Sequence, residues 1–121
     1  VLVAPAGGTL VVRDPASELR KLRRICRRAE LHEDGGQRLV HLPELRVQYA
    51  GGVETVDGLL CPGQHSGYVS RLFLSKPFPA RGQNWTTHNI LGALWYAMSW
   101  NGVDPSLGWD EILGAHLRPL Q

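Results

Sequence analysis

The chain has 121 residues, 43% hydrophobic and 20% charged, which is the composition of one globular domain and excludes a disordered segment. Its formal net charge is +2, and no apolar run approaches the roughly 20 residues that a membrane-spanning helix needs. Residues 1–10 lack the basic start and long apolar stretch of a secretion signal, so we expect a cytoplasmic protein without membrane association.

The first third of the sequence predicts an extended lead-in followed by a helix. Residues 1–13 are apolar and β-branched and are interpreted as a strand or a lead-in to a single domain over residues 14–121. Asp14 and Pro15 are typical of a helix start, because aspartate caps free N–H groups and proline suits the first helical position. The helix is expected to end near His32, with an apolar stripe made of Leu19, Leu22, Cys26 and Ala29.

The rest of the chain predicts three strands and then two helices. Strands are expected over residues 40–48, 53–60 and 68–75, with Pro43 marking an edge or a bulge, and their short connections favour an antiparallel meander. A helix capped by Thr86 or Thr87 and ending near residue 101 would follow, and then a last helix containing Trp109. The predicted fold class is therefore α+β, with helices segregated from the sheet.

Cys61 is the first candidate for chemistry, because it ends an apolar strand directly before a Pro-Gly turn. His65 follows four residues later and would act as a base or lower the thiol pKa if the turn folds back. The alternative interpretation is a buried cysteine beside a solvated histidine, since cysteine is among the most buried residue types. With Cys26 as the only other cysteine, no disulfide scaffold, metal site or cofactor is expected.

A second candidate is the polar cluster Asn84, Thr86, Thr87 and His88. At the predicted start of a helix, free N–H groups and the positive end of the dipole would stabilise an oxyanion, with Asn84 as a further donor. Thr86 or Thr87 beside His88 would form a hydroxyl nucleophile with its base. The alternative is plain capping of the helix by a threonine.

The predicted first helix carries much of the positive charge of the chain. Seven of the 13 basic residues lie between Arg13 and Arg28. Three interpretations stay open: a solvated face, a nucleic-acid contact, or a docking surface for an acidic protein. Nucleic acid is the least favoured of these, because no aromatic residues are interleaved with the arginines.

The order of these features resembles the ubiquitin-conjugating (E2/UBC) superfamily, and within it a prokaryotic branch called family E. The resemblance spans about residues 15–121 and lies in three short motifs: residues 59–63 (LLCPG), residues 72–77 (LFLSKP), and the pattern Gly-x-x-Trp-x-x-x-Ser-x over residues 92–100. It departs from the superfamily in the His-Pro-Asn motif that precedes the cysteine. Residues 41–44 (HLPE) match this motif only weakly and lie too far upstream.

The resemblance implies a UBC-like α+β fold and transfer of a ubiquitin-like protein from an activating (E1) enzyme to a target protein. Cys61 would form the thioester, or a threonine of the polar cluster an oxyester, or the chain would be a non-catalytic module that scaffolds conjugation or defence proteins. The activating enzyme would contact the basic helix through Arg20, Arg23, Arg24 and Arg27.

Overall fold

The computed structural model describes residues 14–78, 84–100 and 102–121, so the predicted lead-in over residues 1–13 lies outside it. The elements are α1 (Pro15–Arg23), β1 (Glu30–Asp34), β2 (Gln37–Tyr49), β3 (Gly52–Cys61), β4 (Arg71–Leu74), β5 (Trp85–Ile90), β6 (Ala93–Met98), α2 (Trp109–Leu117) and the 3-10 turn η2 (Arg118–Leu120). The six strands form one antiparallel sheet in the order β1-β2-β3-β4-β6-β5. The expected UBC-like α+β fold, with two C-terminal helices, is therefore wrong: the fold is β-rich.

The first of the two predicted C-terminal helices is a β-hairpin, formed by β5 and β6. Tryptophan and two consecutive threonines open β5, and such aromatic and β-branched residues favour extended backbone. Leu91 and Gly92 connect the strands with φ angles of 52° and 77°, as a two-residue turn matched to strand twist requires. Trp95 and Met98, whose three-residue spacing would place them on one side of a helix, therefore lie on opposite faces of β6.

The first helix is also shorter than the sequence predicted. It ends at Arg23 rather than near His32, and residues 30–34 form β1 instead. A continued helix would stack Arg20 on Arg24 and Arg23 on Arg27, and like charges four residues apart destabilise a helix. The chain turns here instead, and Cys26 is buried as expected, although not on a helix.

The three strands expected in the middle of the chain are present, as β2, β3 and β4. The register between β2 and β3 shifts between Leu42 and Leu45, which confirms the bulge expected at Pro43. The Sγ atom of Cys26 donates a hydrogen bond to the Pro43 oxygen at 3.1 Å. This contact ties the turn after α1 to the bulged strand.

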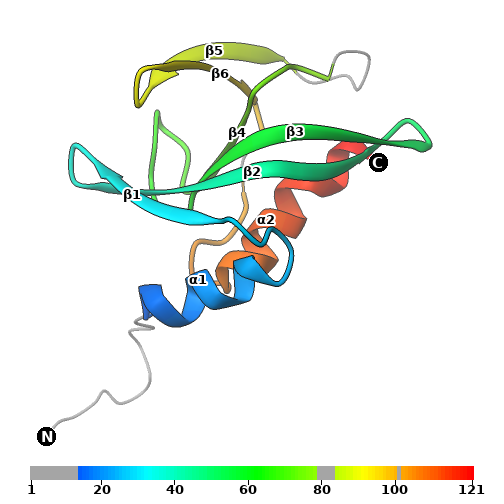
Figure 1. Ribbon diagram of the computed structural model, residues 1–121. Coiled ribbons are helices and arrows are strands. Elements are labelled where there is room, and N and C mark those ends of the chain that lie inside the picture. The colour runs from blue at the N-terminus through cyan, green and yellow to red at the C-terminus, as the bar shows by residue number, and fades with distance from the viewer. Residues whose placement is uncertain (1–13, 79–83, 101) are drawn as a thin grey trace, which may run out of the picture.

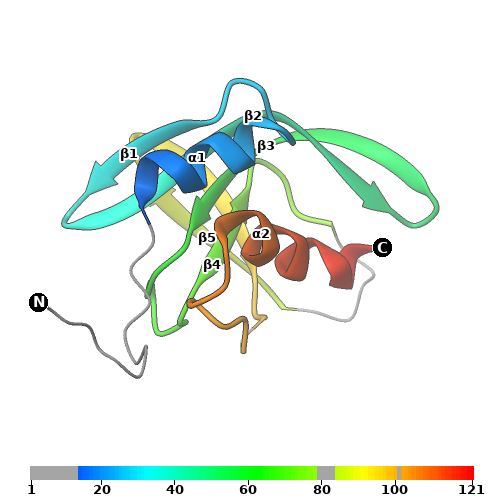
Figure 2. The ribbon, with the colours of Figure 1, turned by 90° about the horizontal axis from the view of Figure 1, so that it is seen from below.

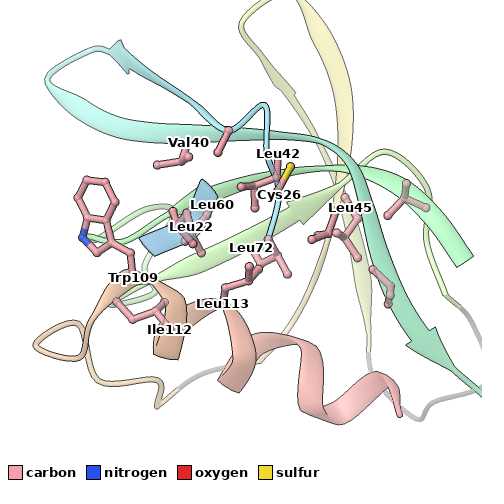
Figure 3. Packing of buried hydrophobic residues seen from close by; sticks show 14 of the residues in the cluster. Leu22, Cys26, Val40, Leu42, Leu45, Leu60, Leu72, Trp109, Ile112 and Leu113 are labelled. Carbon is pink, nitrogen blue, oxygen red and sulfur yellow. The ribbon is translucent and has the colours of Figure 1, made fainter. Parts of the chain in front are cut away.

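The sheet is strongly curved, so that the β5–β6 hairpin lies over one face of the part formed by β1–β4. Both helices lie on the opposite face of that part (Figures 1 and 2). The larger apolar cluster fills the space between helices and sheet, and Figure 3 shows Leu22, Trp109 and Ile112 directed at the strands. A smaller cluster lies on the opposite face and consists of Leu39, Leu59, Cys61, Phe73, Ile90, Trp95, and Ala97. Because both faces of the sheet are covered at β4, all four of its residues are buried.

The last predicted helix, which was to contain Trp109, is present as α2 and starts at that residue. Its buried side chains include Ile112 and Leu113, which pack on the larger cluster. Within the described residues, no helix has the length and apolar character needed to cross a membrane.

Candidate functional site

A buried arginine, the first residue of β4, lies on the smaller, hairpin-covered face of the sheet. Arg71 on β4 is only 3% exposed, and its guanidinium carbon lies 4.1 Å from the ring centroid of Tyr68. Its Nη2 atom donates to Thr86 Oγ1 at 3.3 Å, whereas its Nε atom is buried without a hydrogen-bond partner among the described residues.

Arg71 forms no ion pair with a carboxylate in the part of the chain that the structure describes. Burial lowers the pKa of its guanidinium from the ordinary value, although arginine remains charged at neutral pH. A buried cation without a counter-ion is costly for a fold. It also stabilises negative charge that develops close by, which is the arrangement an oxyanion site uses.

Thr86 and His88 lie two residues apart on β5, so their side chains share the face that holds Arg71. The Thr86 Oγ1 atom lies 2.8 Å from His88 Nε2, and it donates to the Ala97 oxygen at 3.4 Å. Because Arg71 donates to this oxygen, the single hydroxyl proton has two acceptors within reach: the Ala97 oxygen and, when Nε2 of the neutral imidazole carries no proton, His88. The geometry is that of a hydroxyl nucleophile with its base, and Thr86 is exposed while His88 is half-buried.

The electrostatic surroundings keep His88 neutral. Burial lowers its pKa below the ordinary value of 6.5, and the positive charge of Arg71 and the neighbouring His65 lower it further. Above that pKa the imidazole accepts a proton, which is the state a general base needs.

His65 belongs to the same site through the ring of Phe73. The His65 and His88 rings stand edge-on to Phe73, with centroid separations of 5.0 and 5.1 Å. The Nδ1 atom of His65 lies 2.6 Å from Ser66 Oγ, and its pKa is lowered by burial and by Arg71, with Asp34 opposing. The structure therefore brings His65 beside Thr86 and His88, although the sequence had grouped it with Cys61.

The thiol of Cys61 lacks the exposure that a thioester-forming residue requires. Cys61 pairs with Arg71 across β3 and β4, but only 1% of the residue is exposed. Its Sγ atom donates to the Gly63 oxygen at 3.4 Å, and burial raises the thiol pKa despite that hydrogen bond. The residue borders a cavity of about 670 Å³ at this end of the sheet, yet it contributes almost no accessible surface to it.

Two residues of the predicted polar cluster lie apart from the site. Thr87 falls between Thr86 and His88, so its exposed side chain lies on the opposite face of β5. Asn84 is exposed and precedes β5, where its backbone oxygen accepts a hydrogen bond from Ser99 N at 2.8 Å. Since β5 is a strand, the helix N-terminus that was to stabilise an oxyanion does not exist here, and Thr86 Oγ1 is hydrogen-bonded to the Arg71 guanidinium instead.

The basic residues lie elsewhere, along α1 and the turn that follows it. A groove of about 690 Å³ is bordered by Arg23, Arg27, Arg28, Ala29, Glu30, His41 and Pro43. Arg23 Nε donates to the Ala29 oxygen at 3.0 Å, which holds one guanidinium at the groove. Arg20 and Arg24 are exposed on the same segment, and no arginine of this segment pairs with a carboxylate among the described residues.

Arg71 was missed from the sequence, although a signal was present. Residues 68–75 (YVSRLFLS) hold one arginine in an apolar strand with no acidic residue beside it. An arginine there must either be exposed or be buried for a reason, and the apolar residues at both odd and even positions of this strand favour burial.

No group of three or more His, Cys, Asp or Glu side chains in the described segments is placed to hold a metal ion. Comparison of the chain with family models, with curated proteins and with solved structures gives no match.

Proposed function

We propose that this chain carries an acyl group as an ester on the Thr86 hydroxyl and passes it to an amine. The proposal is supported mainly by one observation, the hydrogen-bond chain from Arg71 Nη2 through Thr86 Oγ1 to His88 Nε2. Of the two kinds of nucleophile weighed from the sequence, the threonine has exposure and a base, whereas the Cys61 thiol is buried with a raised pKa.

The reaction takes place in two steps. In the first, Thr86 Oγ1 attacks the carbonyl carbon of an activated acyl donor, its proton moves to His88 Nε2, and the donor's leaving group departs. Arg71 stabilises the negative charge on the tetrahedral intermediate. In the second, an amine attacks the ester carbonyl, and His88 returns its proton to Thr86 Oγ1 as the ester bond breaks. The freed imidazole then takes the proton that the amine loses as the amide forms, and releases it to solvent.

The acyl donor proposed here is the activated C-terminal carboxyl of a ubiquitin-like protein, supplied by an E1-type enzyme in the cytoplasm, with a target protein as acceptor. The identity of the donor depends on the three short motifs over residues 59–100 and not on the fold. The chemistry at Thr86 depends on the site geometry and holds for any activated acyl group of suitable size.

The test uses p-nitrophenyl acetate, an activated ester that needs no partner protein. We expect acetylation of Thr86, located by peptide mass spectrometry and reversed by hydroxylamine, which cleaves esters and leaves amides intact. Thr86→Ala removes the adduct, and His88→Gln slows its formation by about 10²–10⁴-fold, the usual contribution of a general base. With the ubiquitin-like protein, its activating enzyme and ATP, the adduct should survive thiol reduction.

Thr87→Ala is the matched control, because it removes a neighbouring hydroxyl from the opposite face of the same strand and keeps the backbone N–H. An adduct that persists in Thr86→Ala, or that Thr87→Ala abolishes, contradicts the proposal. Loss of the adduct on reduction together with its loss in Cys61→Ser would assign the chemistry to the thiol instead.

A second function, docking of an acidic partner without catalysis, is favoured by the groove beside α1. Three arginines border it, and their only acidic neighbour there, Glu30, lies 3.3 Å from His32 Nε2 through its Oε1 atom. Positive charge that pairs with no carboxylate among the described residues steers an acidic surface into contact, and such association weakens as salt rises.

A fluorescent glutamate-rich peptide tests this docking directly. We expect binding that weakens with added salt and that falls at least tenfold in Arg27→Glu. Arg46→Glu is the control, since Arg46 is an exposed arginine of β2 that does not border the groove. Equal loss in both variants would mean that net charge, and not the groove, attracts the peptide.

A further inference from the structure

One edge of the sheet has open backbone hydrogen-bonding groups beside the proposed nucleophile. β5 is the last strand in the order β1-β2-β3-β4-β6-β5, so only one of its sides is paired. In Figure 1, no other labelled strand lies beside the outer edge of β5.

The two-residue turn determines which groups are open. Ile90 and Ala93 close the turn, and such a closing pair exchanges both of its hydrogen bonds. Hydrogen-bonded pairs alternate along an antiparallel ladder, so Thr86 and His88 also bond to β6. The backbone groups of Thr87 therefore point away from β6, as do those of Asn89.

A second observation supports the conclusion that alternate residues of β5 form their backbone hydrogen bonds with β6. Asn84 lies two residues before Thr86, and its backbone oxygen accepts from Ser99 N on the extension of β6. The backbone N–H and C=O groups of even-numbered residues in this segment thus point towards β6, as the geometry of the turn requires. Thr87 and Asn89 are both exposed, and no backbone hydrogen bond to either from outside the hairpin occurs within the described residues.

The two edges of the sheet differ in how they are protected. Natural edge strands carry charges, prolines or bulges, and these features prevent unwanted pairing with other strands. β1, at the other edge, has three acidic residues among its five, whereas β5 (WTTHNI) has no acidic residue, lysine, arginine or proline. The β5 edge is therefore the one suited to accept a strand.

We infer that the β5 edge binds an extended, uncharged peptide as an added strand, through the backbone groups of Thr87 and Asn89. Added strands lie about 4.8 Å from their neighbour, so the end of such a peptide reaches the Thr86 hydroxyl on the adjacent face. The occupant to which we commit is the C-terminal tail of the acyl donor, and this identity rests on the proposed function.

The experiment measures peptide binding apart from acylation. The probe is a fluorescein-labelled hexapeptide whose first four residues alternate between threonine and valine and whose last two are glycine. Its binding is measured by fluorescence anisotropy. In NMR hydrogen exchange, the amides of Thr87 and Asn89 should exchange rapidly in the free protein and become protected on adding the peptide. The same peptide with alternate backbone nitrogens methylated should not bind, because it cannot complete the ladder.

Thr87→Pro and Asn89→Pro are the deciding variants. Each removes an outward N–H without breaking a β5–β6 bond, and proline is tolerated at such edge positions. We expect at least a tenfold loss of affinity in both, whereas Thr87→Ala and Asn89→Ala bind normally because they keep the N–H. Circular dichroism shows whether each proline variant folds. If one of them misfolds, the other still tests the assignment.

The outcomes separate the two proposals. Peptide binding in Thr86→Ala, with no acylation of the native chain, would support the edge and reject the ester chemistry. Binding that is unchanged in the proline variants, or protection of amides on β1 instead of β5, overturns the edge assignment. Absence of any binding by the native chain overturns it as well.

Discussion

The carboxylate of Glu18, on α1, accepts a hydrogen bond of 2.9 Å from the backbone nitrogen of Trp109, the first residue of α2. Its other oxygen lies 3.0 Å from Lys21 Nζ, and the residue is 3% exposed. A negative group at the N-terminus of a helix satisfies a free N–H and opposes the positive end of the dipole. One buried side chain thus joins the two helices, 91 positions apart, on the same side of the sheet.

Replacing Glu18 by alanine should lower the free energy of unfolding by about 1–3 kcal/mol, because a buried N–H loses a charged acceptor. Urea denaturation followed by circular dichroism measures the loss. Glu33→Ala serves as the control: Glu33 is an exposed acid of β1, and its removal should change stability by less than about 0.5 kcal/mol. Equal effects in the two variants would show that the bond to Trp109 is not stabilising.

The buried His116 makes the fold sensitive to mild acid. Its Nε2 atom lies 3.0 Å from Ser70 Oγ, and that hydroxyl donates to the Val103 oxygen at 3.2 Å. Burial, with a smaller effect of Arg71, lowers its pKa to about 4 from 6.5. Between these two values the unfolded chain binds a proton that the native protein excludes.

Stability is therefore complete above about pH 6.5 and falls as the pH approaches 4, by about 3 kcal/mol in all. The lowered pKa values of His65 and His88 act in the same direction. Urea denaturation at a series of pH values should show this decline, and His116→Gln should flatten it. A profile that stays steep in the variant would assign the decline to other groups.

The hairpin was hidden from sequence analysis because its apolar residues fit two periods at once. Leu91, Leu94, Trp95 and Met98 have helical spacing, yet in the structure Leu91 lies in the turn and Trp95 and Met98 lie on opposite faces of β6. What separates the cases is local: consecutive threonines favour a strand, and a leucine and a glycine at positive φ make the turn.

The site was predicted in part for the same reason. Thr86, His88 and His65 were identified as residue types with suitable chemistry, and two of them are neighbours in the chain. Arg71 joins them through strand pairing, and such long-range pairing is not encoded in local spacing. Cys61 had two interpretations, a reactive thiol near the surface or a buried cysteine, and the structure shows a buried cysteine because the hairpin covers the face on which it lies.

Gly92 should be needed for the hairpin because of its backbone and not its size. Its φ is +77°, and an added Cβ would meet nothing within 4 Å, so Gly92→Ala introduces strain without a clash. The expected loss is about 1–2 kcal/mol, the cost of a left-handed conformation for an ordinary residue. Gly63→Ala is the control, since its φ is not in the left-handed region and it also has open space. Thermal unfolding of both variants measures the difference, and equal melting temperatures would contradict it.

The pH dependence of acylation tests the electrostatic link between Arg71 and His88. Because the pKa of His88 lies below 6.5, the rate of Thr86 acetylation by p-nitrophenyl acetate should rise with pH in the acidic range and level off before pH 7. The protonated imidazole cannot accept the hydroxyl proton, so the slope has this sign.

Arg71→Met removes the positive charge while keeping an unbranched side chain of similar length. The pKa of His88 should then move up towards 6.5, so the midpoint of the rate profile should shift to higher pH. The plateau rate should also fall, because the intermediate loses its cation. A lower plateau with an unmoved midpoint would mean that Arg71 only positions Thr86. A midpoint that moves to lower pH would contradict the assignment of His88 as the base.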